Sequence, residues 1–353
     1  MKRLVLTGGG TAGHVTPHLA LIPHLEAEGY DLYYIGTADG IERELIPARI
    51  PYYPISAGKL RRYFHWRNFT DPLRVMWGTL QAWRILRRIR PAAIFSKGGF
   101  VTVPVAVAGR MLGIPVLLHE SDYSPGLANR ISLRFAQRIC LTFPETLVYV
   151  PRDKAVVTGT PIRDELHQGS REEGLRLCGF TPSRPTVLVM GGSLGSQVLN
   201  EAVRKALPQL TRTYQVIHLC GRGNVDPSLT YKHYCQFEYA TAELPHLFAA
   251  ADYVVSRAGA NSIFELCSLR KPNVLVPLSR QASRGDQILN AQSFAQQGFS
   301  MVIEEKDLTE AALLSALAEL QANREKYVQA MEKSGLGDGT ANLLREIRAI
   351  ASR

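Results

Sequence analysis

The most constraining feature of this sequence is a regular alternation of short apolar runs with helical stretches, which starts twice along the chain. The runs lie at residues 4–6, 32–35, 93–95, 116–118, 138–141 and 156–157 in the first half, and at residues 187–190, 216–219, 253–255 and 274–276 in the second. Such alternation is typical of parallel sheets that are covered by helices on both faces. We therefore expect an α/β fold made of two doubly wound, Rossmann-like domains.

A Gly-rich turn follows the first strand of each half, at residues 8–13 (GGGTAG) and 191–196 (GGSLGS). Turn residues at 159–161 end the last strand of the first half, and a second Gly-rich break at 334–339 precedes a short helix over residues 341–352. We expect an N-terminal domain over residues 1–162, a C-terminal domain over residues 163–335, and a terminal helix within residues 336–353.

Length and composition exclude several classes of protein. A chain of 353 residues suits two domains, and 46% hydrophobic with 20% charged residues excludes a disordered chain, collagen and a coiled coil. The apolar runs are too short to cross a bilayer, and the first residues enter a strand pattern, which favours a cytoplasmic protein without a signal peptide. The five cysteines lack C-x-x-C spacing, so we expect neither a disulfide framework nor a zinc ribbon.

Most of the net charge of +10 lies between residues 59 and 90. A helix over residues 71–90 would carry two apolar stripes, one of which can face the core. The second stripe lies beside arginines, a combination that favours an anionic membrane surface; it contains Leu73, Met76, Trp77, Leu80 and Trp83 with Arg84 and Arg87. The alternative is that both stripes are buried and the arginines form a solvated rim. The helical spacing of the aromatic residues disfavours a nucleic-acid surface.

The first Gly-rich turn has the G-x-G-x-x-G spacing that brings backbone N–H groups close to a phosphate. A dinucleotide enzyme would also need an acidic residue at the end of the second strand. That strand ends with Thr37, and Asp39 comes late, so a nicotinamide-dependent dehydrogenase is disfavoured. His14 follows the turn, either as a structural cap of the helix or as an imidazole beside a phosphate or sugar. His14 and His18 lack a third ligand, so no zinc site is expected.

Two further segments, at residues 96–101 and 119–122, are expected at the carboxyl ends of strands, where ligands bind in open α/β sheets. Ordinary turn chemistry explains their glycines but not the grouping of His119, Glu120 and Asp122. In the second half, the hydroxyl of Ser193 can donate to an anion, and Glu265 is expected in the first turn of a helix that begins near Ile263. A carboxylate there either complements the helix dipole or accepts the two hydroxyls of a ribose.

Together these motifs resemble the peptidoglycan N-acetylglucosaminyltransferases of glycosyltransferase family 28. The matching segments run in order over nearly the whole chain: GGGTAGH at 8–14, KGGFV at 97–101, HESD at 119–122, PGLAN at 125–129, GGSLG at 191–195, RAGANSIFE at 257–265 and DQ at 286–287. The resemblance implies a glycosyltransferase B fold, with two Rossmann-like domains facing a cleft and a terminal helix that crosses back to the N-terminal domain. It also implies transfer of GlcNAc from UDP-GlcNAc to the 4-hydroxyl of the MurNAc-pentapeptide of lipid I, which gives lipid II.

The resemblance also carries over site residues and partners. It implies donor contacts from Thr11, Ala12, Gly13, Arg163, Ser193, Ala240, Arg257, Gly259, Ala260, Asn261, Glu265 and Gln287. It implies a peripheral protein at the cytoplasmic face of the cell membrane, with the anionic inner leaflet and other cell-wall synthesis or division proteins as partners, and no nucleic acid. Many members have H-E-Q-N where this chain has HESD, so Asp122 replaces an asparagine that is assigned to donor binding; an ionised carboxylate cannot donate as an amide does.

No residue is marked as a covalent nucleophile, so we expect a single displacement with inversion at the anomeric carbon. His14 is the first candidate for the base that activates the acceptor hydroxyl, and Glu120 or Asp122 the second. The chain contains no Asp-x-Asp and no P-loop motif, so no metal and no cofactor is expected. The alternatives are a diacylglycerol glycosyltransferase or a UDP-GlcNAc 2-epimerase of the same architecture.

Overall fold

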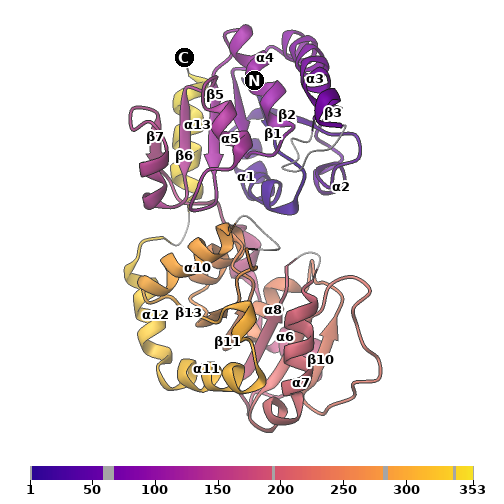
Figure 1. The fold of residues 1–353 in the computed structure, drawn as a ribbon, viewed down its shortest axis with the longest axis vertical. Helices are drawn as coiled ribbons and strands as arrows, with labels where there is room; N and C mark the ends of the chain where they lie inside the picture. The colour runs from indigo at the N-terminus through magenta and orange to yellow at the C-terminus, as the bar shows by residue number, and fades with distance from the viewer. Residues whose placement is uncertain (1, 59–66, 193–194, 281–284, 337–338, 353) are drawn as a thin grey trace. The chain divides into compact units, whose positions relative to one another are not determined.

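The computed structural model describes residues 2–58, 67–192, 195–280, 285–336 and 339–352. The chain forms two compact units, one of residues 1–161 with 338–353 and one of residues 162–337. Each unit is a parallel sheet with helices packed on it (Figure 1). The predicted class of two doubly wound α/β domains is confirmed.

Unit 1 contains a seven-stranded sheet in the order β3-β2-β1-β4-β5-β6-β7. Its strands are β1 (Lys2–Thr7), β2 (Tyr30–Gly36), β3 (Tyr52–Pro54), β4 (Ala93–Ser96), β5 (Val116–Glu120), β6 (Arg138–Leu141) and β7 (Ala155–Val157). Its helices are α1 (Thr16–Ala27), α2 (Glu42–Leu45), α3 (Arg67–Ile89), α4 (Thr102–Met111), α5 (Leu127–Ser132) and α13 (Thr340–Ala351), with short 3-10 turns η1 (Ala12–His14) and η2 (Pro144–Tyr149).

The two faces of this sheet carry separate cores, because successive residues of a strand point to opposite faces. Leu4 and Leu6 of β1 belong to a cluster that includes α1 and α13, whereas Val5 belongs to a cluster with α3 and α4. The C-terminal helix α13 therefore completes one face of unit 1, and Figure 1 shows it in yellow among the elements of that unit.

Unit 2 contains a six-stranded sheet in the order β10-β9-β8-β11-β12-β13. Its strands are β8 (Thr186–Met190), β9 (Gln215–Leu219), β10 (Tyr234–Phe237), β11 (Tyr253–Ser256), β12 (Asn273–Leu275) and β13 (Ser300–Val302). Its helices are α6 (Arg171–Cys178), α7 (Gln197–Thr213), α8 (Leu244–Ala250), α9 (Ala260–Ser268), α10 (Asp286–Gln296), α11 (Glu310–Ala322) and α12 (Arg324–Lys333), with 3-10 turns η3 (Asp164–Gln168) and η4 (Glu305–Asp307).

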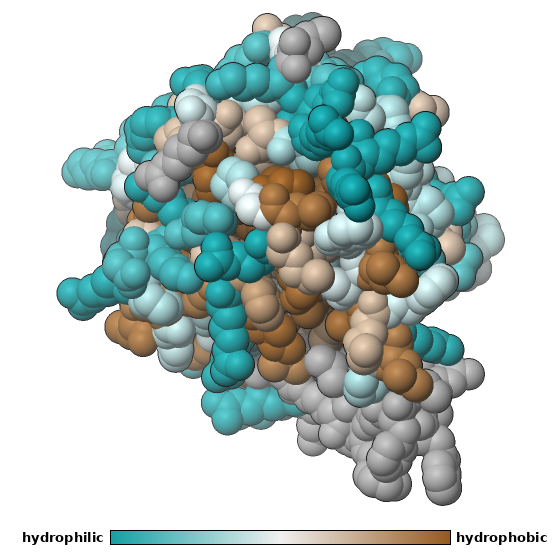
Figure 2. All heavy atoms as spheres, turned by 90° about the horizontal axis from the view of Figure 1, so that it is seen from above, coloured by the Kyte–Doolittle hydropathy of each residue, from teal (hydrophilic) through white to brown (hydrophobic). Residues whose placement is uncertain are grey.

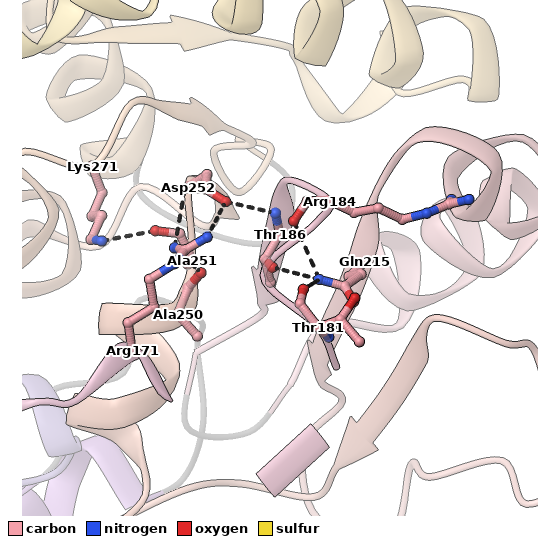
Figure 3. A network of polar contacts seen from close by, with 9 residues as sticks. All are labelled: Arg171, Thr181, Arg184, Thr186, Gln215, Ala250, Ala251, Asp252 and Lys271. Atoms are coloured by element: carbon pink, nitrogen blue, oxygen red, sulfur yellow. Dashed lines mark hydrogen bonds and ion pairs between the residues drawn. The ribbon is translucent and has the colours of Figure 1, made fainter. Parts of the chain in front are cut away.

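A polar network joins α6 to the amino-terminal end of this sheet (Figure 3). The Arg171 guanidinium donates to both carboxylate oxygens of Asp252, at 3.1 Å each, and Asp252 accepts the backbone N–H of Thr186 at 2.9 Å. Nearby, Lys271 Nζ donates to the carbonyl of Ala251 at 2.8 Å. These contacts lie at the edge of the sheet opposite to the one where ligands bind, so they hold the fold rather than a substrate.

Three strands were missed from the sequence: β3, β10 and β13. All three are edge strands of three or four residues, and their residues are mostly half-buried, so they lack the continuous apolar run that marks a central strand. Two helix starts were also wrong. Helix α9 begins at Ala260 rather than near Ile263, and α3 begins at Arg67 rather than at Asp71.

Candidate active site

The carboxyl ends of β1, β4 and β5 are neighbours in unit 1 and bring three loops together. The backbone N–H of Gly9 donates to the carbonyl of Gly98 at 3.3 Å, which joins the loop after β1 to the loop after β4. Gly99 has φ +88°, and a Cβ there would lie 2.2 Å from the carbonyl oxygen of Gly9. Only glycine permits this approach, so the sequence GGF after Lys97 is needed to bring the two loops into contact.

His14 is the last residue of η1 and lies beside the contact between the loops after β1 and β4. Its Nδ1 is 3.1 Å from the carbonyl oxygen of Gly9 and 3.1 Å from Thr11 Oγ1. A carbonyl only accepts, so Nδ1 carries the proton and Nε2 carries the lone pair in the neutral ring. The ring also lies close to the loop after β4, since a Cβ on Gly98 would be 3.4 Å from His14 Cδ2. The backbone carbonyl of Gly9 thus favours the tautomer of His14 with the proton on Nδ1.

Glu42, at the start of α2, is a buried carboxylate that the sequence analysis missed. Its Oε2 accepts the N–H of Gly10 at 3.1 Å, and its Oε1 accepts the N–H and the hydroxyl of Thr37 at 2.9 and 2.6 Å. An internal carboxylate therefore uses the Gly10 N–H, which in a dinucleotide-binding turn would face the phosphate. No motif marks Glu42, because its contact to the turn depends on how α2 folds back after β2.

Lys97 and His119 form a second buried group at the carboxyl ends of β4 and β5. Lys97 Nζ donates to His119 Nδ1 and to Ser121 Oγ, and both ring and ammonium are buried. His119 Nε2 lies 2.9 Å from the carbonyl of Gly159, so Nε2 carries the proton and Nδ1 accepts from Lys97. Burial lowers the pKa of Lys97 to about 7, and burial together with Lys97 holds the pKa of His119 well below its usual range.

Glu120 ends β5 and fastens the loop that follows it. Its Oε1 accepts the N–H of Asp122 at 3.1 Å, and its Oε2 accepts the N–H of Gly126 and the amide of Asn129, both at 2.9 Å. Both oxygens are therefore directed at N–H donors of the same loop. The structure brings His14, Glu120 and Asp122 to one edge of the sheet. The hydrogen bonds of Glu120 hold the loop that follows β5 in place.

In unit 2, the Gly-rich turn after β8 leads into α7, where the Ser196 hydroxyl accepts the backbone N–H of Leu199 at 3.3 Å. Arg257, from the loop after β11, donates to Ser196 Oγ at 2.6 Å and to Glu305 Oε1 at 2.6 Å. The guanidinium is buried, so it joins the two loops of this edge. Ser193, the predicted contact for the diphosphate, lies outside the described residues.

Arg163 and Glu265, two predicted donor residues that are far apart in the sequence, form an ion pair with 3.2 Å between Nη2 and Oε1. Glu265 lies in the second turn of α9, so the expected place in the first turn is wrong; the helix begins three residues earlier than predicted. Burial raises the pKa of Glu265, although Arg163 acts in the opposite direction. This position disfavours the interpretation that Glu265 complements the helix dipole, because the dipole acts mainly on the first turn of a helix.

Of the other predicted donor residues, Thr11, Ala12 and Gly13 lie in unit 1, at the start of η1 after β1. The rest lie in unit 2, in segments that follow the strands of its sheet. Gln287 is the second residue of α10, and its Oε1 accepts the N–H of Leu278 at 3.1 Å. Gly259 is the N-cap of α9, with Ala260 and Asn261 in its first turn, and Ala240 lies in the loop after β10. Among the described residues, no group of three or more His, Cys, Asp or Glu side chains is placed to hold a metal ion.

One face of α3 is apolar and open to solvent. Leu73, Met76 and Trp77 are 65%, 68% and 53% exposed, while Ala82 and Leu86 on the other side of the helix are fully buried. The interpretation that buries both stripes is therefore wrong for these residues. Trp83 is partly buried against the core, and the Arg87 guanidinium lies 5.1 Å from its ring centre. Figure 2 shows brown apolar side chains bordered by teal hydrophilic ones on the face where α3 and α4 lie.

The described helices include none that is long and apolar enough to span a membrane. Two doubly wound units, each with a Gly-rich turn after its first strand, have the architecture of the glycosyltransferase B fold. Two family models match: the glycosyltransferase family 28 N-terminal domain over residues 4–141 and its C-terminal domain over residues 186–346. The chain belongs to glycosyltransferase family 28, as the motifs predicted.

Curated relatives and solved structures agree with this assignment. The chain is 55% identical to a protein of Lachnoclostridium phytofermentans, over 99% of both chains, and 52% identical to one of Clostridium tetani, over 97% of this chain and 96% of the relative. Both relatives are named UDP-N-acetylglucosamine–N-acetylmuramyl-(pentapeptide) pyrophosphoryl-undecaprenol N-acetylglucosamine transferase. MurG of Acinetobacter baumannii has a similar structure, with a TM-score of 0.77 and 26% identity over 99% of this chain and 100% of that chain.

A UDP-GlcNAc 2-epimerase from Neisseria meningitidis also shares the fold, with a TM-score of 0.66 and 13% identity over 99% of this chain and 100% of that chain. At this identity the likeness concerns the fold alone. The transferase prediction is therefore supported over the epimerase alternative by the relatives named above.

Proposed function

We propose that this chain transfers GlcNAc from UDP-GlcNAc to the 4-hydroxyl of the MurNAc-pentapeptide of lipid I, giving lipid II for peptidoglycan synthesis. The observation that carries the proposal is identity of 51–55% with relatives of that name over nearly their whole length. Lipid I is a saccharide diphosphate on an undecaprenyl chain, so the reaction takes place at a membrane surface.

Unit 2 is the proposed donor unit. The amino-terminal end of α7 favours the UDP diphosphate, because the helix dipole and the N–H groups of a first helical turn attract anions. Glu265 is the proposed acceptor for the ribose hydroxyls and Gln287 the proposed contact for the GlcNAc hydroxyls. The pair of Arg163 and Glu265 supports this assignment, since donor binding can use the carboxylate for the diol and the guanidinium for the diphosphate.

Unit 1 is the proposed acceptor unit, with His14 as the general base. The Nδ1 contact to Gly9 leaves Nε2 as the basic nitrogen, and the ring lies at the junction of the loops after β1 and β4. Glu120 is less suited to the role, because three N–H groups already point at its oxygens. We propose attack of the deprotonated hydroxyl on the anomeric carbon with inversion, and departure of UDP with its charge held by N–H groups and Arg163.

Release of UDP from UDP-GlcNAc, measured with and without a soluble lipid I analogue, tests the function. We expect release only with the acceptor, together with formation of a disaccharide product, and we expect EDTA to leave the rate unchanged. Conversion of UDP-GlcNAc without the acceptor would instead indicate an epimerase. Transfer to diacylglycerol in place of the lipid I analogue would indicate the other alternative.

We also propose that the exposed face of α3 binds the anionic inner leaflet of the cell membrane, where lipid I lies. Leu73, Met76 and Trp77 offer apolar area, and Arg74, Arg84 and Arg87 on the same helix offer positive charge, which is the combination that interfacial helices use. At this surface the chain could meet other cell-wall synthesis or division proteins.

A further inference from the structure

We propose that Lys97 is a positioning residue for sugar transfer: its ammonium holds the turn at residues 121–126 through His119 and Ser121, and its charge compensates the carboxylate of Asp122. The inference rests on the proposed function and deepens it. Lys97 is not among the predicted site residues, and its side chain is too deeply buried to touch a substrate.

The hydrogen bonds of Lys97 form a continuous chain across three strand ends. Its Nζ donates to His119 Nδ1 and to Ser121 Oγ. His119 Nε2 in turn donates to the carbonyl of Gly159, just beyond β7. The lysine from the loop after β4 therefore fixes both the orientation of a β5 side chain and the first residue of the turn that carries Asp122. A neutral side chain of the same length would keep the volume but lose both contacts.

The charge of Lys97 has no direct counter-ion among these hydrogen bonds, because His119 and Ser121 are neutral. A buried ammonium is costly unless a nearby negative charge compensates it. Glu120 and Asp122, on the turn that Lys97 holds, are the carboxylates that raise the pKa of Lys97 and oppose the effect of burial. Glu120 also holds the turn through three hydrogen bonds, so its substitution would change the turn as well as the charge, and the effect of the charge is tested at Asp122.

The charge of Lys97, which holds the turn at residues 121–126, depends on pH. The titratable groups that face Lys97 come from β5, the turn after it, β6 and α1: His119, Glu120, Asp122, Cys140 and His18. Of these, the two carboxylates favour the charged ammonium. Burial holds the pKa of Lys97 near about 7, so the ammonium is present in acid and is lost as the pH rises above that value. We therefore expect kcat to fall on the alkaline side as Lys97 loses its proton.

The test is a double-mutant cycle of Lys97→Met and Asp122→Asn, with kcat measured against pH in the assay with the lipid I analogue. We expect each single substitution to lower kcat about tenfold. If the two residues act together, the double variant should also lose about tenfold in kcat, whereas independent effects would multiply to about a hundredfold loss. Lys97→Met should remove the alkaline fall in kcat. Asp122→Asn should move that fall to lower pH, because the carboxylate raises the pKa of Lys97.

Lys271→Met is the matched control, since Lys271 is a second largely buried lysine whose pKa is lowered to about 8 by burial. It lies in the network of Figure 3, away from the strand ends that carry the site, so its loss should leave the pH profile of kcat unchanged. If Lys97→Met keeps the alkaline fall, or if the double variant equals the product of the single losses, the proposal is wrong.

Two results keep the outcomes apart. If the wild-type enzyme does not use the lipid I analogue, the proposed function fails and not the role of Lys97. Thermal unfolding shows whether Lys97→Met folds. If it does not fold, the pH at which kcat falls in Asp122→Asn is the measurement that tests the proposal. No shift in that variant would overturn the proposal.

Discussion

Two buried carboxylates of unit 1 hold loops in place at the edge of the sheet where the sequence predicted catalytic residues. Glu42 and Glu120 each accept three hydrogen bonds from the loops beside them. These hydrogen bonds connect the carboxylates to the loops that follow β1, β2 and β5. The imidazole of His14, held through Nδ1 by a backbone carbonyl, is the group at this edge that we propose as the base.

Substitution of His14 by Ala is therefore expected to lower kcat by about 10²–10⁴-fold, the usual contribution of a positioned base. The affinity for UDP should stay within about twofold, because we place the nucleotide on unit 2. Steady-state kinetics with the lipid I analogue and calorimetric titration of UDP measure the two effects. A variant with near-normal turnover would remove His14 from the mechanism.

The buried ammonium of Lys97 also affects stability, and its sign follows from its pKa. The native pKa is about 7, against 10.5 for a lysine in an unfolded chain, so between these values the unfolded state binds a proton that the native state does not. Stability therefore rises with pH across this window, and the cost of the ammonium is fully present below about pH 7.

Lys97→Met should accordingly be more stable than the wild type near pH 6, by up to about 5 kcal/mol, because a pKa difference of about 3.5 corresponds to 1.36 kcal/mol for each unit. The difference should shrink as the pH approaches 10. Denaturant unfolding followed by tryptophan fluorescence reports on unit 1, because all three tryptophans, Trp66, Trp77 and Trp83, belong to it. A stability difference that does not change between pH 6 and pH 10 would contradict this prediction.

Among the elements, α3 has one buried side and one exposed apolar side. Its inner side, with Ala82, Leu86 and Ile89, packs on the sheet, and its outer side leaves Met76 and Trp77 more than half exposed. The close approach of Gly78 to the carbonyl of Ser56, where a Cβ would lie 2.0 Å from the oxygen, fixes which side faces inward. The rotation of α3 about its axis therefore determines that the second stripe is exposed.

Trp77→Glu is expected to weaken binding to anionic vesicles about tenfold or more, because burial of a large aromatic side chain contributes about 1.5–3 kcal/mol. The binding that remains should fall further as salt is added, since arginines on α3 supply its electrostatic part. Vesicle co-sedimentation measures both effects. Tyr231→Glu, at an exposed aromatic residue of unit 2, is the matched control and should bind like the wild type; equal binding of Trp77→Glu would refute the assignment.

At the scale of the whole molecule, the chain ends in the unit where it began. Helix α13 inserts Leu343, Ile347 and Ile350 into the cluster that includes β1 and α1, and the Glu346 carboxylate pairs with Arg138 of β6. Gly339 makes the return possible, because a Cβ there would lie 2.5 Å from the carbonyl carbon of Gly159. Unit 1 is thus closed by the last residues of the chain, and its stability depends on them.

Ile347→Ala should destabilise unit 1 by about 2–5 kcal/mol, because it opens a cavity in a fully buried position. Arg345→Ala, on the exposed face of the same helix, should change stability by less than about 0.5 kcal/mol. Tryptophan fluorescence in denaturant measures both. An unchanged midpoint in Ile347→Ala would mean that α13 is not part of the cooperative unit.

The sequence by itself determined the class of fold, the central strands, the Gly-rich turns and the family, because each depends on local periodicity or on residue types at fixed spacing. Tertiary structure alone decided the edge strands, the start of α9, and which loops each buried charged group holds. Glu42, Lys97 and the pair of Arg163 with Glu265 illustrate the reason. The partners of a buried charge come from distant segments, and their contacts exist only once the strands have brought those segments to one edge of a sheet.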